Sequence, residues 1–117
     1  MGIIYMEGVA KGPKGEEAEV SFLMDSGVSY SLLPESVWRP FGLEPTREMA
    51  FTLADGTRVE RQNSRCYLVL HQGEDYSPVI LGEPGDEAIL GVVTLEILGL
   101  VFNPFSCTLH PMRMMLA

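Results

Sequence analysis

The chain has 117 residues, of which 46% are hydrophobic and 21% are charged. That length is typical of one domain and that composition of a globular protein, so we expect a single domain over residues 1–117. The formal net charge of −8 argues against nucleic acids and anionic membranes as partners, because the chain has too few basic groups to neutralise their phosphates.

The beginning of the sequence is not expected to act as a secretory signal. MGIIYMEGVAKGP lacks the basic stretch and apolar run that such signals need, so we expect a cytoplasmic protein. In that compartment Cys66 and Cys107 are expected to be free thiols, although their spacing alone leaves a disulfide open.

Membrane and metal signals are also missing. The apolar window 88–102 is short for a bilayer span and contains Glu96, which indicates a buried core segment. His71 and His110 have no Cys or His partner at ligand spacing. We therefore expect no metal site and no cofactor.

The first third of the chain predicts a β-hairpin, a loop and a helical turn. In chain order the expected elements are a strand over 3–11, a turn over 12–15, a strand over 18–25, an extended piece over 30–33 and a helical turn over 34–42. Pro34 is expected at the first helical position, where its missing N–H has no cost, and Gly42 is expected to end the helix.

The remainder predicts further short strands and one short helix. The expected elements are a hairpin over 49–70, strands over 77–82 and 87–91, a helix over 93–99 and two closing strands over 100–111, with a frayed tail over 112–117. At the hairpin tip, Asp55-Gly56 favours a tight turn in which both residues take positive φ. The helix is expected to bury Val93 and Ile97. Seven or eight strands with at most two helices predict an all-β sandwich or barrel.

One carboxylate follows directly after a predicted buried strand. In FLMDSGVSYSLL (22–33), Asp25 comes after three apolar residues and before Ser26-Gly27. Asp-Ser-Gly by itself is typical of an ordinary turn, because Asp bonds to nearby backbone N–H groups and Gly accepts positive φ. Desolvating an acid is costly, so the wider context decides whether Asp25 has a chemical role.

That context resembles the retropepsin-like (clan AA) aspartic peptidases, the retroviral-type family and its bacterial single-domain members. The family pattern of two hydrophobic residues, Asp, Thr or Ser, Gly and Ala stands here as Leu23-Met24-Asp25-Ser26-Gly27-Val28, followed by a hydroxyl at Ser31. LADGTRVE and ILGVVTLEILGLVFNP look like the bacterial members. The resemblance spans residues 3 to 111 and implies a retropepsin-like acid-protease barrel with one short C-terminal helix, a flap hairpin near 49–62 and one half-site per chain.

The resemblance also implies an activity and a partner. Aspartic peptidases use two carboxylates that share a proton, and this chain has one Asp-Ser-Gly. The implied enzyme is therefore an aspartic endopeptidase that is active as a homodimer, with Asp25 of both copies at the two-fold axis. Its substrate would be an extended peptide or protein segment, bound as an added strand.

Residue roles follow from the same resemblance. Asp25 is the implied catalytic acid/base, Ser26 bonds within the network that joins the two catalytic loops, and Gly27 lets the backbone approach the substrate. The implied substrate-binding residues are Val28, Ser29 and the flap tip Leu53, Ala54, Asp55, Gly56 and Thr57. The implied structural support of the site comes from Ser31, Ile89, Leu90 and Gly91.

The sequence departs from the family at four places. Val28 replaces the usual Ala and could narrow the groove. Retroviral members pair an Arg with a carboxylate at the positions of Val92 and Ser29, and here both partners are absent together, so no buried charge is left alone. The flap is not glycine-rich, and the direction of the Asp55 side chain is open.

Two other functions stay open at this point. A retropepsin fold can serve as a dimerisation or extended-peptide-binding module without proteolysis, since fold does not fix function. A serine hydrolase is also conceivable because Ser26 and Ser29 lie together, but the GxSxG motif is absent.

Overall fold

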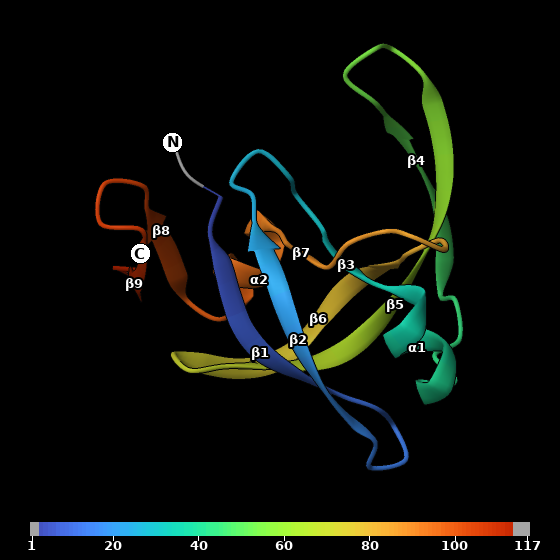
Figure 1. Ribbon diagram of the computed structural model, residues 1–117, viewed down its shortest axis with the longest axis horizontal. Helices are drawn as coiled ribbons and strands as arrows, with labels where there is room; N and C mark the ends of the chain where they lie inside the picture. The colour runs from blue at the N-terminus through green and yellow to red at the C-terminus, as the bar shows by residue number, and fades with distance from the viewer. Residues whose placement is uncertain (1–2, 114–117) are drawn as a thin grey trace, which may run out of the picture.

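The computed structural model describes residues 3–113, so the predicted tail falls partly outside the described residues. The elements are β1 (Tyr5–Lys11), β2 (Glu17–Met24), β3 (Ser31–Leu33), α1 (Glu35–Phe41), β4 (Arg47–Thr52), β5 (Arg58–Leu70), β6 (Gly73–Leu81), β7 (Ile89–Leu90), α2 (Val92–Ile97), β8 (Leu100–Asn103) and β9 (Thr108–Pro111) (Figure 1). Strands dominate, which confirms the all-β prediction.

Six of the strands close into a ring. The main sheet has the order β1-β2-β7-β3-β6-β5-β4, and β1 pairs with β5 as well as with β2. Gly8 of β1 lies opposite Val20 on one side and Leu70 on the other. In the described part of the chain β4 pairs with β5 alone, so the β4–β5 hairpin extends beyond the ring (Figure 1).

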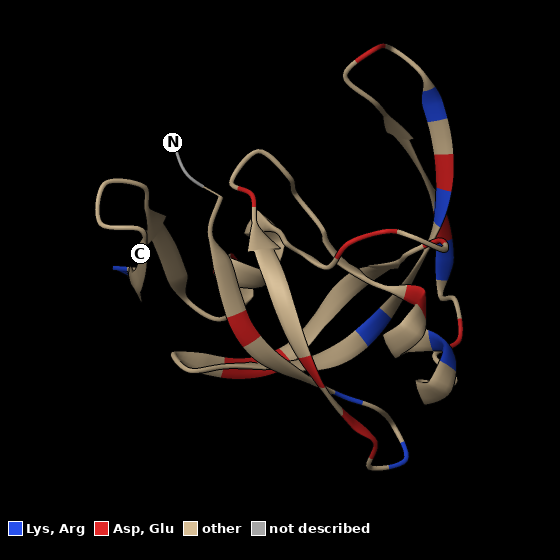
Figure 2. Ribbon diagram, in the orientation of Figure 1, with Lys and Arg blue, Asp and Glu red and all other residues tan. Residues whose placement is uncertain are grey.

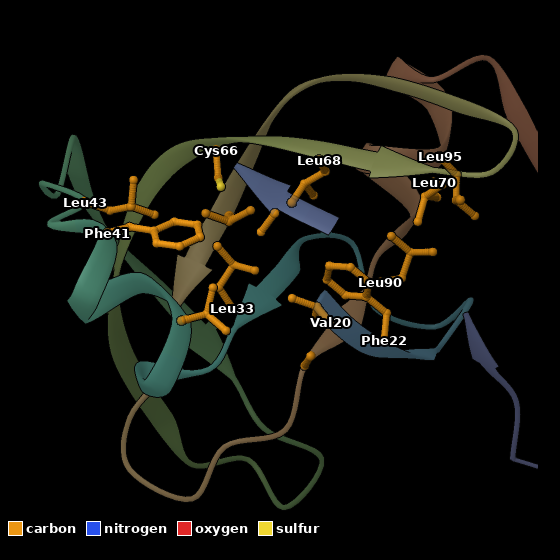
Figure 3. Close-up of a cluster of buried hydrophobic side chains, with 14 of the residues drawn as sticks. Val20, Phe22, Leu33, Phe41, Leu43, Cys66, Leu68, Leu70, Leu90 and Leu95 are labelled. Atoms are coloured by element: carbon orange, nitrogen blue, oxygen red, sulfur yellow. The ribbon is translucent and has the colours of Figure 1, made fainter. Parts of the chain in front are cut away.

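The core follows from strand alternation. In β2, Val20 and Phe22 are buried while the adjacent Glu19 and Ser21 are exposed, as expected when successive side chains point to opposite faces. Figure 3 shows Phe22 and Leu90 among the buried side chains inside the barrel. Each such side chain stabilises the fold by about 1.5–3 kcal/mol relative to full exposure.

The two-residue strand β7 determines where the Asp25 loop runs. β7 pairs in parallel with β2 through Leu23↔Ile89 and antiparallel with β3 through Leu32↔Ile89. It therefore lies between the two strands that the loop of residues 25–30 connects. The loop has to cross from one side of β7 to the other, which places Asp25 at the end of β2 beside Leu90.

The helices differ in detail from the predictions. Pro34 is the residue before the first helical residue of α1, and Gly42 ends that helix in a left-handed conformation with φ 66°. The prediction that α2 buries Ile97 is wrong, because this side chain is 39% exposed. The helix begins at Val92 and packs against β6 and β8, and the side that meets them carries Thr94 and Leu95, both buried.

Both cysteines are free, with Cys66 buried and Cys107 exposed. Burial raises the pKa of the Cys66 thiol to about 11, which keeps it protonated at neutral pH and unreactive as a nucleophile.

Among the described residues, no helix combines the length and apolar character needed to cross a bilayer.

Candidate active site

The Asp25 carboxylate lies at the start of a short loop that is stabilised by hydrogen bonds between its own residues. The Gly27 N–H donates to Oδ1 of Asp25 at 2.9 Å, and the Val28 N–H donates to the Asp25 carbonyl at 3.2 Å. Asp25 is half-buried, whereas Ser26 and Gly27 are exposed. Within residues 3–113, the other carboxylate oxygen, Oδ2, accepts no hydrogen bond.

The beginning of α2 fixes the far side of the loop. The Val92 N–H donates to the Val28 carbonyl at 2.9 Å, and the Val93 N–H donates to the Ser29 carbonyl at 2.8 Å. The first N–H groups of a helix have no partner within the helix, and here they bind the Asp25 loop. Val28 and Ser29, expected to contact substrate, are thus also held in place through their carbonyl groups.

Gly91 is needed for this close approach. A Cβ at position 91 would lie 2.6 Å from the Ser29 carbonyl oxygen and 2.5 Å from the Tyr30 carbonyl carbon. Both are backbone atoms, which cannot turn aside as a flexible side chain could. Of the other support residues, Leu90 is fully buried and Ile89 is half-buried, as strand residues between β2 and β3.

A chain of buried hydroxyl groups lies beneath the loop. The Gly91 N–H donates to Oγ of Ser31 at 2.9 Å, and Ser31 Oγ lies 2.5 Å from Oγ1 of Thr94. Thr94 Oγ1 is in turn 2.7 Å from Oγ of Ser77, which donates to the Pro78 carbonyl. The three hydroxyl groups join β3, α2 and β6 directly under the Asp25 loop, and all three side chains are buried.

Sequence reasoning missed Ser77 and Thr94. The available signal was a pair of hydroxyl residues inside apolar segments, SPVILG and VVTLEILG. Buried polar groups are almost always hydrogen-bonded, so each needed a partner inside the fold. Which partner each finds depends on the pairing of β3 with β6, and the sequence does not show that pairing.

The predicted flap tip, residues 53–57, is an exposed turn. The Leu53 N–H donates to the Thr57 carbonyl at 2.7 Å and the Gly56 N–H to the Leu53 carbonyl at 2.9 Å. Only Gly56 has a positive φ, of 87°, so the prediction that Asp55 shares this conformation is wrong. The four-residue turn over 53–56 needs one left-handed residue, whereas a two-residue turn would need two.

The direction of Asp55 is settled by its hydrogen bonds. Oδ1 accepts the Thr57 N–H at 2.8 Å, so the side chain turns back into its own loop. Hydrogen bonds from Thr57, first from its side chain and then from its backbone, lower the pKa of Asp55. The turn therefore retains a negative charge in mildly acidic solution.

One aromatic contact links the flap hairpin to the Asp25 loop. Tyr30, at the end of the loop, meets Phe51 of β4 edge to face, with ring centroids 6.2 Å apart. Among the described residues, no hydrogen bond joins the flap tip to residues 25–30. The structure thus brings together Asp25 to Ser29, Ser31 and the 89–91 segment, while Leu53 to Thr57 stand apart on the hairpin.

A pocket of about 220 Å³ lies beside Asp25. Among residues 3–113 it is lined by Ile4, Met24, Asp25, Ser26, Phe102, Pro104 and Cys107, of which Asp25 alone carries a carboxylate. The volume is below the roughly 300–1,000 Å³ of a typical ligand site. A larger and more open hollow of about 650 Å³ lies between α1 and residues 84–86, away from Asp25.

The described charged side chains do not cluster around a common point. Within residues 3–113, no three His, Cys, Asp or Glu side chains gather closely enough to hold a metal ion. The arrangement instead presents a single half-buried carboxylate on a tightly held loop, next to a small and mostly apolar pocket. A single carboxylate can take or give one proton. Chemistry that needs both an acid and a base requires a second group from elsewhere.

Comparison with known proteins identifies the architecture. No protein-family model matches the sequence, and no curated protein matches it. Among solved structures, the solution structure of Simian Foamy Virus (mac) protease superposes with a TM-score of 0.60 at 17% sequence identity, covering 81% of this chain and 94% of the viral chain. An overlap this extensive at such low identity shows shared architecture and no more. The chain has a retropepsin-like fold.

Proposed function

We propose that the chain is an aspartic endopeptidase, related to the bacterial retropepsin-like members, that works as a homodimer. The observation that carries the proposal is the position of Asp25. It directly follows β2, its loop is held by β7 and α2, and no other carboxylate of residues 3–113 lines the pocket beside it. The fold shared with a viral protease supports the same reading.

The chemistry follows from bringing two Asp25 carboxylates together across a two-fold axis. Two carboxylates held close do not both ionise easily, so the pair shares one proton and titrates in coupled steps. The ionised member takes a proton from a water molecule, which then attacks the peptide carbonyl carbon. The protonated member donates a hydrogen bond to the carbonyl oxygen, where negative charge develops.

The remaining residues position the reactants. Ser26, exposed beside Asp25, would bond between the two loops, and Gly27 would leave room for the peptide backbone. Val28 and Ser29 would form the floor of the groove and residues 53–57 its cover, which excludes water when closed. Ser31, Ile89, Leu90 and Gly91 would support the floor through the contacts described above.

The test is cleavage of an unstructured peptide library across acidic and neutral pH by the wild type, Asp25→Asn and Asp75→Asn. Asp25→Asn keeps the shape and removes the acid, so we expect it to abolish cleavage. Asp75, which bonds to the adjacent Tyr76 N–H on β6, provides a matched control that should cut normally. Activity should be greater in mildly acidic solution than at neutral pH, and equal cleavage by both Asn variants would refute the proposal.

One observation favours a second function. In the described chain, β4 has a strand partner on one side only, and such an open edge can bind an extended peptide by strand addition. A peptide-binding dimer without proteolysis would use this edge. It would bind library peptides equally well with Asp25→Asn, and it would release them uncut.

A further inference from the structure

A pocket of about 250 Å³ lies on the outer face of the sheet, over β1, β5 and β6. Its lining combines two cationic side chains, two phenol rings and two apolar walls. These are Lys11, Arg65, Tyr67, Tyr76, Pro13 and Leu43. We call this hollow the sheet pocket.

Strand register brings the polar side chains of the sheet pocket together. Lys11 of β1 lies opposite Tyr67 of β5, and Tyr67 lies opposite Tyr76 of β6. Directly opposed residues point to the same face of a sheet. Arg65 is two positions before Tyr67 on β5 and shares its face, while Cys66 between them is buried in the core. The four polar side chains therefore point outward side by side.

Arg65 is positioned to bind a carboxylate. Among residues 3–113 it forms no salt bridge, and its guanidinium carbon lies over the Tyr76 ring, 5.2 Å from the centroid. Stacking holds the flat guanidinium by its face. The N–H groups at its edge match the two oxygens of a carboxylate, so a ligand acid would meet an arginine that is already oriented.

Lys11 supplies a second positive charge. Its Nζ lies 6.0 Å from the centroid of the Tyr67 ring and 3.8 Å from Oε1 of Glu17. Both side chains of this ion pair are exposed, and exposed pairs contribute little to stability. Lys11 can therefore turn from Glu17 to a bound anion at low cost.

The sheet pocket differs in charge from the rest of the surface. The chain has 16 acidic and 8 basic residues, and Figure 2 shows acidic segments on β1, β2, the flap tip and the loop before β7. The lining of the sheet pocket, taken over residues 3–113, contains no Asp or Glu. The hollow between α1 and residues 84–86, by contrast, is lined by Glu35 and Asp86 as well as Arg39.

The carboxylates near the sheet pocket lie outside its lining. Glu17 ends the pairing of β1 with β2, and Glu74 lies two positions before Tyr76 on β6. Both are exposed, so water and salt screen their charges. They oppose an anion less than two cationic groups in direct contact with it would attract it.

We propose that the sheet pocket binds an aromatic carboxylate, with the acid group on Arg65 and Lys11. Its ring would pack against the tyrosine pair, whose own rings meet edge to face at 5.0 Å, and against the apolar walls. Such a group has two sources, a free small-molecule acid and the C-terminal aromatic residue of a peptide.

The sheet pocket is remote from Asp25. Lys11 pairs with Glu17, the first residue of β2, whereas Asp25 follows the last residue of that strand. A strand of this length spans roughly 25 Å. The inference therefore goes beyond the proposed peptidase function and does not depend on it.

The experiment is an NMR titration of the full ¹⁵N-labelled chain with 3-phenylpropionate and with its uncharged amide. The acid should shift the backbone N–H signals of Lys11, Arg65, Tyr67 and Tyr76 and saturate with a Kd of about 1 mM. The amide has the same ring without the charge, so it should bind at least about tenfold more weakly.

Matched variants test the assigned cation. Arg65→Gln should raise the Kd for 3-phenylpropionate about tenfold or more. Arg58→Gln, at an exposed position on the flap hairpin, removes the same charge outside the sheet pocket and should bind like the wild type. If Arg65→Gln fails to fold, as judged by circular dichroism, Lys11→Gln takes its place and should weaken binding in the same direction.

A peptide arm separates the two sources of the ligand. Gly-Gly-Phe with a free C-terminus is compared with the same peptide carrying a C-terminal amide. Tighter binding of the free peptide than of 3-phenylpropionate would support a peptide end as the ligand. Binding of 3-phenylpropionate alone would support a small-molecule acid.

Several results would overturn the inference. They are the absence of saturable shifts with either acid, equal binding of acid and amide, and wild-type affinity in a folded Arg65→Gln protein. Shifts confined to residues 25–30 would also overturn it, because the acid would then lie at the Asp25 loop. The titration involves no cleavage, so its outcome leaves the peptidase proposal to be decided by the Asp25→Asn comparison.

Discussion

The Asp25 loop and the flap tip differ in how the fold holds them. The loop receives backbone hydrogen bonds from α2 and lies above three buried hydroxyl groups. Among residues 3–113, the hydrogen bonds of the flap tip stay within its own turn, and one aromatic contact links its hairpin to the loop. Segments with few buried contacts open most easily. The proposed peptidase would require this contrast, because Asp25 would stay fixed while residues 53–57 move.

The largest effect should come from filling the space at Gly91. Gly91→Ala would press a methyl group against the Ser29 and Tyr30 backbone, and we expect it to destabilise the fold by about 3 kcal/mol or more. Gly73→Ala is the control, since its added Cβ would meet its nearest neighbour at an ordinary 3.7 Å. Urea unfolding measures both, and a Gly91→Ala protein as stable as Gly73→Ala would show that the loop is not tightly held.

Removing the Thr94 hydroxyl should have the next largest effect. Thr94→Val keeps the shape of the side chain but leaves the hydroxyl groups of Ser31 and Ser77 without this partner. The expected loss is about 1–3 kcal/mol of unfolding free energy, together with lower peptidase activity because the loop shifts. Thr52→Val, at an exposed position on β4, should change stability by less than about 0.5 kcal/mol.

The contact between the flap hairpin and the Asp25 loop should contribute less to stability than the two features above. An aromatic pair such as Tyr30 and Phe51 contributes about 0.5–1.5 kcal/mol. We expect Phe51→Ala to lower the free energy of unfolding by about 0.5–1.5 kcal/mol and to raise KM, because the flap then closes less readily over the peptide. A double-mutant cycle with Tyr30→Ala isolates the pair. Additive effects of the two changes on KM would rule out a coupling between flap and loop.

The smallest effect concerns the charge at the flap tip. The pKa of Asp55 is lowered by Thr57 from its ordinary value of 3.8, so the carboxylate stabilises the turn above that pH. This contribution is lost as the pH falls through the lower folded-state pKa. An NMR titration of the Asp55 carboxyl carbon should give a midpoint below 3.8, whereas Thr57→Val should move the midpoint up. An unchanged midpoint in the variant would contradict the assigned hydrogen bonds.

The two regions also differ in how far the sequence predicts them. The Asp25 loop could be located because an apolar strand, an acid and Ser-Gly are adjacent in the chain, and adjacency fixes local geometry. The hydroxyl groups of Ser77 and Thr94 could not be located, because Thr94 bridges Ser31 and Ser77 only when β3 pairs with β6. A local sequence pattern does not show which distant segments of the chain will pair.

The conformation of the 53–56 turn and the buried face of α2 could not be predicted from the sequence, for related reasons. The φ angle of Asp55 depends on the length of the turn, and Asp-Gly occurs in turns of both two and four residues. The exposed face of α2 depends on where the helix begins. A one-residue difference rotates a helix by about 100°, which is enough to put Ile97 outward in place of Leu95.

The most direct test of a site shared between two chains is a mixing experiment. Wild type and Asp25→Asn are combined in varying ratio at a fixed total concentration above the dimer dissociation constant, and peptide cleavage is measured. If each site needs one Asp25 from each copy, activity falls as the square of the wild-type fraction, to about one quarter in an equal mixture. Activity that stays proportional to the wild-type fraction would mean that one chain carries a complete site, contradicting the account.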